Sequence, residues 1–215
     1  MLHRKDILRF YRDASFGTRL YIAVKLRICP LLEVEAYFPK RGKALDLGCG
    51  NGFFSSLLKL GSPGRTVVGM DLDPKKIGQA KRLEKRFEGL RFDEGNIAEA
   101  PFPPADMVSL IDVLYLIPFD AQERILRRAY DALRPGGRLL LKDMDTRPRW
   151  KYAWNSFQET ISVRIVGFTL GSRFYFRSRA DYARLLESIG FKVEAVPLDR
   201  RQCYPHILFV GRKGS

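Results

Sequence analysis

Residues 44–52 read ALDLGCGNG, and no other stretch of the chain says as much about its fold. An aliphatic run that breaks into three glycines and then into a helical pattern predicts a buried strand, a tight turn and a helix start. At such a turn a ligand can lie against bare backbone at the beginning of the helix. We therefore expect a ligand-binding loop over residues 48–52.

A second aliphatic strand, TVVGM over residues 66–70, ends at Asp71. An acidic residue at this strand end is placed to accept hydrogen bonds from a ribose, so a dinucleotide and S-adenosylmethionine (SAM) are the two candidate ligands. The dinucleotide pattern GxGxxG needs a third glycine or alanine, but the chain has Ser55 at that position. Asp46 at the end of the first strand would repel a pyrophosphate but would suit a cationic ligand. These residues favour SAM.

The same stretch resembles motif I of class I SAM-dependent methyltransferases, in which an acidic residue precedes three glycines at alternate positions. The resemblance matches Asp71 with the acidic residue that binds the adenosine ribose. At Asn96 the family often carries an acidic residue near the adenine amino group, which Asn96 can contact through its side-chain oxygen. The cofactor-binding residues implied by the resemblance are Asp46, Gly48, Gly50, Gly52, Asp71, Leu72, Asn96, Ile97 and Ile111.

From residue 43 onward strands alternate with helices, which predicts an α/β, Rossmann-like doubly wound sheet. We expect helices over residues 52–60, about 120–133 and 179–189, and a further helix that begins at Pro74. Two further segments resemble this family: DVLYLI over residues 112–117 and the Pro-Gly-Gly turn over residues 135–137. The resemblance implies seven strands, mostly parallel with a C-terminal antiparallel hairpin. The predicted strands cover residues 43–47, 66–70, 90–93, 105–111, 138–142, 191–196 and 207–211.

Two segments lie outside the resemblance. Residues 1–42 are expected to form an N-terminal helical cap, and residues 43–215 the SAM-binding domain, with a helical insertion over 144–177 that serves as a substrate lid. Aromatic residues at near-helical spacing in both segments are interleaved with basic residues. They fit the core of a packed lid, an aromatic pocket, or a surface that contacts a membrane.

The 215 residues carry 38 Lys and Arg against 24 Asp and Glu, a formal net charge of +14. Residues 1–43 contribute +6, residues 44–143 only +1, and residues 144–215 contribute +7. The basic excess therefore flanks the predicted cofactor domain and indicates an anionic partner: a nucleic acid, an anionic membrane surface or an anionic small molecule. No apolar run approaches the length of a membrane span, which predicts a cytoplasmic protein. Peripheral association of this protein with a membrane is the second location that the sequence allows.

Methyl transfer from a sulfonium requires mainly alignment and dehydration of the reactants, and a base only for an acceptor that holds its proton tightly. Asp112 and Asp143 at strand ends, and Tyr115 near the methyl donor, are the candidate catalytic residues. The three cysteines are scattered without CxxC spacing, so no metal site is predicted. The candidate substrate-binding residues are Tyr115, Arg147, Trp150, Arg173 and Tyr175.

Three functions are compatible with these sequence features. The favoured one is a SAM-dependent methyltransferase acting on a small-molecule or lipid-like acceptor, which an arginine could hold by an anionic group. The second is an RNA or other nucleic-acid methyltransferase. The third is a protein with this fold that binds a partner without catalysis. The acceptor atom, the oligomeric state and the pathway are not specified by any motif.

Overall fold

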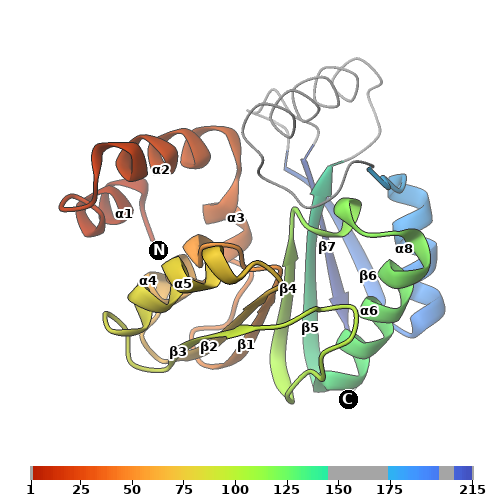
Figure 1. The fold of residues 1–215 in the computed structure, drawn as a ribbon. Coiled ribbons are helices and arrows are strands. Elements are labelled where there is room, and N and C mark those ends of the chain that lie inside the picture. The colour runs from red at the N-terminus through yellow and green to blue at the C-terminus, as the bar shows by residue number, and fades with distance from the viewer. Residues whose placement is uncertain (1, 145–173, 199–205, 215) are drawn as a thin grey trace.

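The computed structural model describes residues 2–144, 174–198 and 206–214. Its centre is a seven-stranded sheet in the order β3-β2-β1-β4-β5-β7-β6 (Figure 1). Neighbouring strands from β3 to β5 pair in parallel, and β7 pairs antiparallel with both β5 and β6. The strands are β1 (Gly42–Leu47), β2 (Arg65–Asp71), β3 (Leu90–Glu94), β4 (Ala105–Ile111), β5 (Leu133–Met144), β6 (Lys192–Pro197) and β7 (His206–Arg212). The predicted Rossmann-like sheet with its C-terminal hairpin is confirmed.

Helices cover both faces of this sheet, because its strands are apolar on both sides. One hydrophobic cluster joins helices at the N-terminal side to one face, and a second cluster joins α6 and α8 to the other. Figure 1 shows the same grouping, with α1 to α3 beside α4 and α5. The helices are α1 (Arg4–Phe10), α2 (Phe16–Ile28), α3 (Leu31–Glu35), α4 (Phe53–Gly61), α5 (Pro74–Glu84), the 3-10 helix η1 (Leu114–Leu116), α6 (Phe119–Ala132) and α8 (Arg179–Ile189).

Helix ends follow the expected capping chemistry. The Asp73 side chain accepts hydrogen bonds from the backbone amides of Lys75 and Lys76 at the start of α5, with Pro74 in the first turn. The largest difference from the predicted boundaries is at β5, which begins at Leu133 rather than at residue 138. Leu133 pairs with Ala105 across a register shift, so the Pro-Gly-Gly turn lies inside the paired segment as an irregularity.

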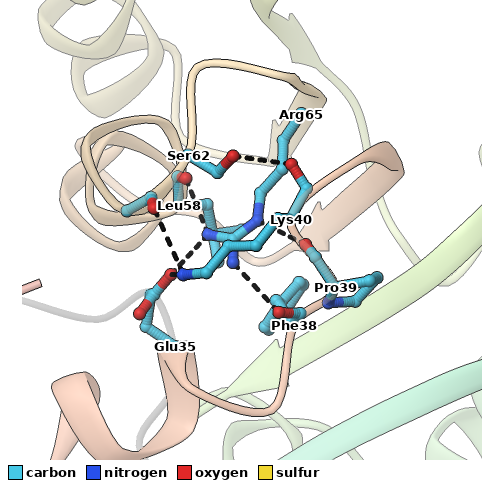
Figure 2. Close-up of polar contacts among 8 residues, drawn as sticks. Glu35, Phe38, Pro39, Lys40, Leu58, Ser62 and Arg65 are labelled. Carbon is cyan, nitrogen blue, oxygen red and sulfur yellow. Dashed lines mark hydrogen bonds and ion pairs between the residues drawn. The ribbon is translucent and has the colours of Figure 1, made fainter. Parts of the chain in front are cut away.

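The N-terminal helices are fixed to the sheet by a buried ion pair. The guanidinium of Arg65, at the start of β2, donates to Glu35 Oε1 of α3 at 2.6 Å, and both side chains are only 1% exposed. The same guanidinium donates to the carbonyl oxygens of Leu58, Phe38 and Pro39, as Figure 2 shows. These bonds satisfy the guanidinium on several sides, as a buried charge requires. Helix α3 and the segment before β1 are therefore held against α4 and β2.

The proposed division into a cap over 1–42 and a domain over 43–215 stays a prediction. In the described residues, α1 to α3 share one hydrophobic cluster with α4 and α5. No helix among residues 2–144, 174–198 and 206–214 is long and apolar enough to cross a membrane.

Candidate active site

The loop between β1 and α4 is held in an unusual backbone conformation by its glycines. Gly48 and Gly50 have φ of 74° and 56°, in the left-handed region that favours glycine. A Cβ at Gly48 would lie 2.5 Å from Val113 Cγ2, so the loop packs directly on the segment after β4. A Cβ at Gly50 would meet no atom within 4 Å, so this stretch of backbone faces open space. A ligand can therefore approach the loop backbone at Gly50.

The amides of this loop are largely used within the protein. Gly48 and Cys49 donate their N–H groups to the Met70 carbonyl oxygen at 2.8 and 3.0 Å, and Gly52 donates to the Cys49 carbonyl oxygen. The Gly50 N–H donates to Asp71 Oδ2 at 2.8 Å. A pyrophosphate needs such amides as donors. The loop thus suits a ligand that contacts it through van der Waals surface, which agrees with the preference for SAM over a dinucleotide.

Asp71 lies at the end of β2 and joins the loop to the start of α5. Besides the Gly50 amide, its carboxylate accepts the Asp73 N–H on Oδ1 at 3.0 Å. These two bonds fix the orientation of the carboxylate, and each oxygen keeps a lone pair for a ligand hydroxyl. Its predicted role towards a ribose stays a prediction that this geometry fits.

Asp46 is buried beneath the loop. Its carboxylate is 1% exposed and accepts hydrogen bonds from the hydroxyls of Ser55, at 2.6 Å, and Ser109, at 2.8 Å. Burial raises its pKa to about 6, against the lowering effect of the two hydroxyls. The two serines fix this carboxylate inside the protein, so its action on a cationic ligand would be through its electric field.

The remaining predicted cofactor residues lie at the carboxyl ends of neighbouring strands. Leu72 follows β2 and is 52% exposed, whereas Ile97, shortly after β3, is buried. The Asn96 side-chain oxygen accepts the Ala98 N–H at 3.0 Å. Ile111 is the last residue of β4. Because β1 pairs with both β2 and β4, and β2 with β3, the sheet brings these residues to one edge around the glycine loop.

Asp112 is engaged in a buried ion pair directly after β4. Its side chain contacts Lys142 of β5, which is fully buried, and Lys25 of α2 at 3.8 Å. The Cys29 thiol donates to the same carboxylate at 3.4 Å. Burial alone would raise the pKa of Asp112, but Lys142 and then Lys25 lower it well below the usual range. Asp112 is therefore a stable anion and a weak base, and its φ of 55° is unusual for a residue other than glycine.

Asp143, the second candidate base, is bound by α8. Its carboxylate accepts the Tyr182 hydroxyl at 2.6 Å and the Met144 N–H at 2.8 Å, and it is 1% exposed. Burial raises its pKa to about 7. Both of its oxygens are thus engaged by protein donors in the core between β5 and α8.

Tyr115 lies in η1 and packs against the described end of the predicted lid. Its ring stacks on Phe176 with centroids 5.0 Å apart and lies 6.0 Å from Phe174. Its carbonyl oxygen accepts the Tyr175 N–H at 2.7 Å, and the Tyr175 ring packs edge-on against Phe119. The structure therefore brings together Tyr115 and Tyr175, two of the predicted substrate residues. The other three, Arg147, Trp150 and Arg173, lie outside the described residues.

Three residues at this edge, Gln122, Lys142 and His206, belong to no motif in the sequence. Gln122 of α6 donates to the carbonyl oxygens of Leu114, Ile117 and Tyr175 and so ties residues 174–177 to η1. Lys142 gives a weak signal, as a lysine within an aliphatic strand. His206 of β7 contacts the Ile28 carbonyl oxygen through Nε2 at 2.8 Å, which places the end of α2 at this edge. Among the described residues no group of three potential ligands could hold a metal ion.

A seven-stranded sheet of this order, with a glycine loop after β1 and a carboxylate at the end of β2, is the architecture of the class I SAM-dependent methyltransferases. A family model described as a methyltransferase domain matches residues 39–169. The chain belongs to this methyltransferase family.

Individual relatives agree with this class. The chain is 34% identical over 147 residues to a demethylmenaquinone methyltransferase of Thermus thermophilus, covering 68% of this chain and 63% of the relative. It is 33% identical over 122 residues to a trans-aconitate 2-methyltransferase of Methylobacterium nodulans, covering 55% and 45%. The chain thus spans less than two thirds of either relative.

Among solved structures, the fold is similar to the S-adenosylmethionine-dependent methyltransferase SibL in its apo form. The TM-score is 0.73 at 22% identity, and the match covers 94% of this chain and 60% of that chain. At this identity the comparison supports the fold alone.

Proposed function

We propose that this chain transfers a methyl group from SAM to a small, largely apolar acceptor at the carboxyl edge of β1, β4 and β5. The observation that carries the proposal is the aromatic group of Tyr115, Phe174 and Phe176. Tyr115 follows Val113, the residue that packs against Gly48 of the predicted cofactor loop. An apolar wall beside a methyl donor suits an acceptor with an aromatic or aliphatic body.

The loop and Asp71 fit the cofactor. The open backbone at Gly50 admits a ligand, and the fixed carboxylate of Asp71 can accept two ribose hydroxyls. When bound, SAM supplies an electrophilic methyl group on a sulfonium. The residues of the chain would orient the acceptor and exclude water from the donor edge.

The charge of Asp112 indicates which chemical class of methyl acceptor the site can use. Because Asp112 is paired with Lys142 and Lys25, it is poorly suited to remove a tightly held proton. We propose an acceptor that is already anionic near neutral pH, such as a carboxylate or an acidic phenol. The two named relatives act on small molecules by their descriptions, in agreement with this size class.

The test uses SAM labelled in its methyl group, offered with small carboxylic acids, with a lipid extract or with total RNA. We expect label in an acid or in the lipid extract. Tyr115→Leu should lower kcat/KM for that acceptor at least tenfold and leave the Kd for SAM within about twofold. Tyr130→Leu, an aromatic of α6 that packs on Phe191, is the matched control. Label only in RNA, or SAM binding with no acceptor in any arm, would overturn the proposal.

A further inference from the structure

Helix α2 is apolar on two sides, although the protein covers only one of them. Its inner side enters the hydrophobic cluster through Ile22, which is 2% exposed, with Leu26 packed beside it. Its outer side exposes Phe16 at 80%, Leu20 at 53% and Val24 at 47%. A helix that is hydrophobic all round normally has partners all round. The outer side of α2 therefore lacks a cover within the described structure.

The exposed apolar residues form one continuous stripe. Phe16, Leu20, Val24 and Ile28 recur every fourth residue along α2. At 3.6 residues per turn, each step advances the stripe by about 40°, so it winds about 120° around the helix over roughly 18 Å. A stripe of this width suits burial of the outer side of α2 in an apolar layer.

The stripe continues into a groove between α1 and α2. Leu8 of α1, itself partly exposed, faces Phe16 and Leu20 across a hollow of about 280 Å³, with Arg19 at its wall. Figure 1 shows α1 and α2 as a pair on the outside of the molecule, with α4 and α5 beside them. The two helices thus present one composite surface, which we call the α1–α2 face.

Positive charge surrounds this apolar centre. The exposed cations of α1, α2 and their connection are Arg4, Lys5, Arg9, Arg12, Arg19 and Arg27. The exposed acids of the same region are only Asp6 and Asp13, and Asp13 is paired with Arg12. Arginine and lysine around an apolar stripe match the phosphates of an anionic lipid surface, with the acyl region beneath them.

We propose that the α1–α2 face docks on an anionic lipid bilayer, with Phe16, Leu20, Val24 and Ile28 entering the interface. A second copy of the chain fits less well, because a symmetric contact would bring like-charged faces together. A single-stranded nucleic acid also fits less well, because the centre of the stripe is mainly aliphatic and offers few rings for base stacking.

The inner side of the same helix reaches the active-site edge. Lys25 of α2 contacts Asp112 after β4, and the Ile28 carbonyl oxygen contacts His206 of β7. A lipid surface on the outer side would therefore lie next to the edge where the acceptor is proposed to bind. The docking proposal itself does not depend on the acceptor, because it can be tested without SAM.

The experiment measures co-sedimentation of the whole chain with vesicles of phosphatidylcholine alone or mixed equally with phosphatidylglycerol. We expect binding to the anionic vesicles, weakened by high salt. Leu20→Glu and the double variant Arg19→Glu/Arg27→Glu should each reduce the affinity at least tenfold. Lys192→Glu, an exposed charge reversal on β6, is the control and should reduce it less than threefold. Circular dichroism and SAM binding of each variant establish that it is folded.

Four results would overturn the proposal. The first is that the wild type does not bind anionic vesicles, and the second is that Leu20→Glu binds them as well as the wild type does. The third is that the control Lys192→Glu loses as much vesicle affinity as the α2 variants. The fourth is that the chain forms a dimer, which Leu20→Glu converts to a monomer. The last result would assign the stripe to a second copy. Loss of vesicle binding in a variant that still methylates a soluble acceptor separates this proposal from the proposed activity.

Discussion

Asp71 connects the two halves of the predicted cofactor site through its two carboxylate oxygens. One oxygen holds the glycine loop at Gly50, and the other holds the turn before α5 at Asp73. At the scale of single residues, this carboxylate is the strongest candidate for a direct contact with the cofactor. Asp46, which is equally acidic, is fixed by Ser55 and Ser109 beneath the loop.

Asp71→Ala should lower the affinity for SAM at least about a hundredfold, because two hydrogen bonds to a charged group are worth about 1.5–3 kcal/mol each and tenfold in Kd is about 1.4 kcal/mol. Titration calorimetry with SAM measures the effect. Asp120→Ala removes an exposed carboxylate of α6 that pairs with Arg124, and should leave the Kd unchanged. An unchanged Kd in Asp71→Ala would remove Asp71 from the cofactor site.

Asp143 should make stability depend on pH. Burial raises its pKa from 3.8 to about 7, so the folded state holds a proton that the unfolded state has released. This contribution is fully present below about pH 4 and is lost as the pH rises through about 7.

In Asp143→Asn the side chain is always neutral. The unfolding free energy of the wild type, measured relative to that of Asp143→Asn, should therefore be about 2–3 kcal/mol higher at about pH 5 than at about pH 8. Urea unfolding at the two pH values measures the gain. Asp106→Asn is the control, since Lys43 and Arg134 lower the pKa of Asp106 and it stays ionised over this range. A difference between wild type and Asp143→Asn that does not vary with pH would contradict the raised pKa.

At the scale of elements, the buried side chain of Gln122 contributes several of the bonds that join residues 174–177 to η1 and α6. The Gln122 amide donates to three carbonyl oxygens, and its oxygen accepts from Arg177 Nε at 2.8 Å. These contacts position the aromatic group of Tyr115 and Phe176. The end of the predicted lid is therefore set by α6, the helix before the insertion.

Gln122→Ala should cost about 2 kcal/mol of unfolding free energy, because buried carbonyl oxygens lose their donor. Trypsin should also cleave at Arg177 faster than in the wild type, because the segment loses its anchor. Gln79→Ala on the exposed side of α5 is the matched control and should change neither quantity. Equal trypsin protection in the two variants would show that Gln122 does not hold the segment.

At the scale of the whole molecule, the predicted cofactor site draws on β1, β2, β3 and β4, so a ligand bound there should stabilise the entire domain. With SAM at about a hundred times its Kd, the linkage is worth about 2.7 kcal/mol, which raises Tm by roughly 5–10 °C for a chain of this size. NAD at the same concentration should leave Tm unchanged. Thermal unfolding with each ligand is the measurement, and a shift with NAD alone would overturn the choice between the two cofactors.

Much of the fold could be predicted from the sequence, because local patterns encode it. The ALDLGCGNG stretch, the aliphatic strands and caps such as Asp73 and Ser178 act within a few residues of one another. The predicted cofactor positions follow from the same local pattern, since parallel strands bring their carboxyl ends to one edge.

The sheet, the order of its elements and the position of the glycine loop follow from the sequence alone. Which carboxylates are engaged by protein donors and cations is visible only in the folded chain. Asp112 meets Lys25 and Lys142, and Asp143 meets Tyr182, through contacts between residues far apart in the chain. Because burial and partners set the charge of a carboxylate, and both arise only when distant segments pack together, no local pattern could reveal them.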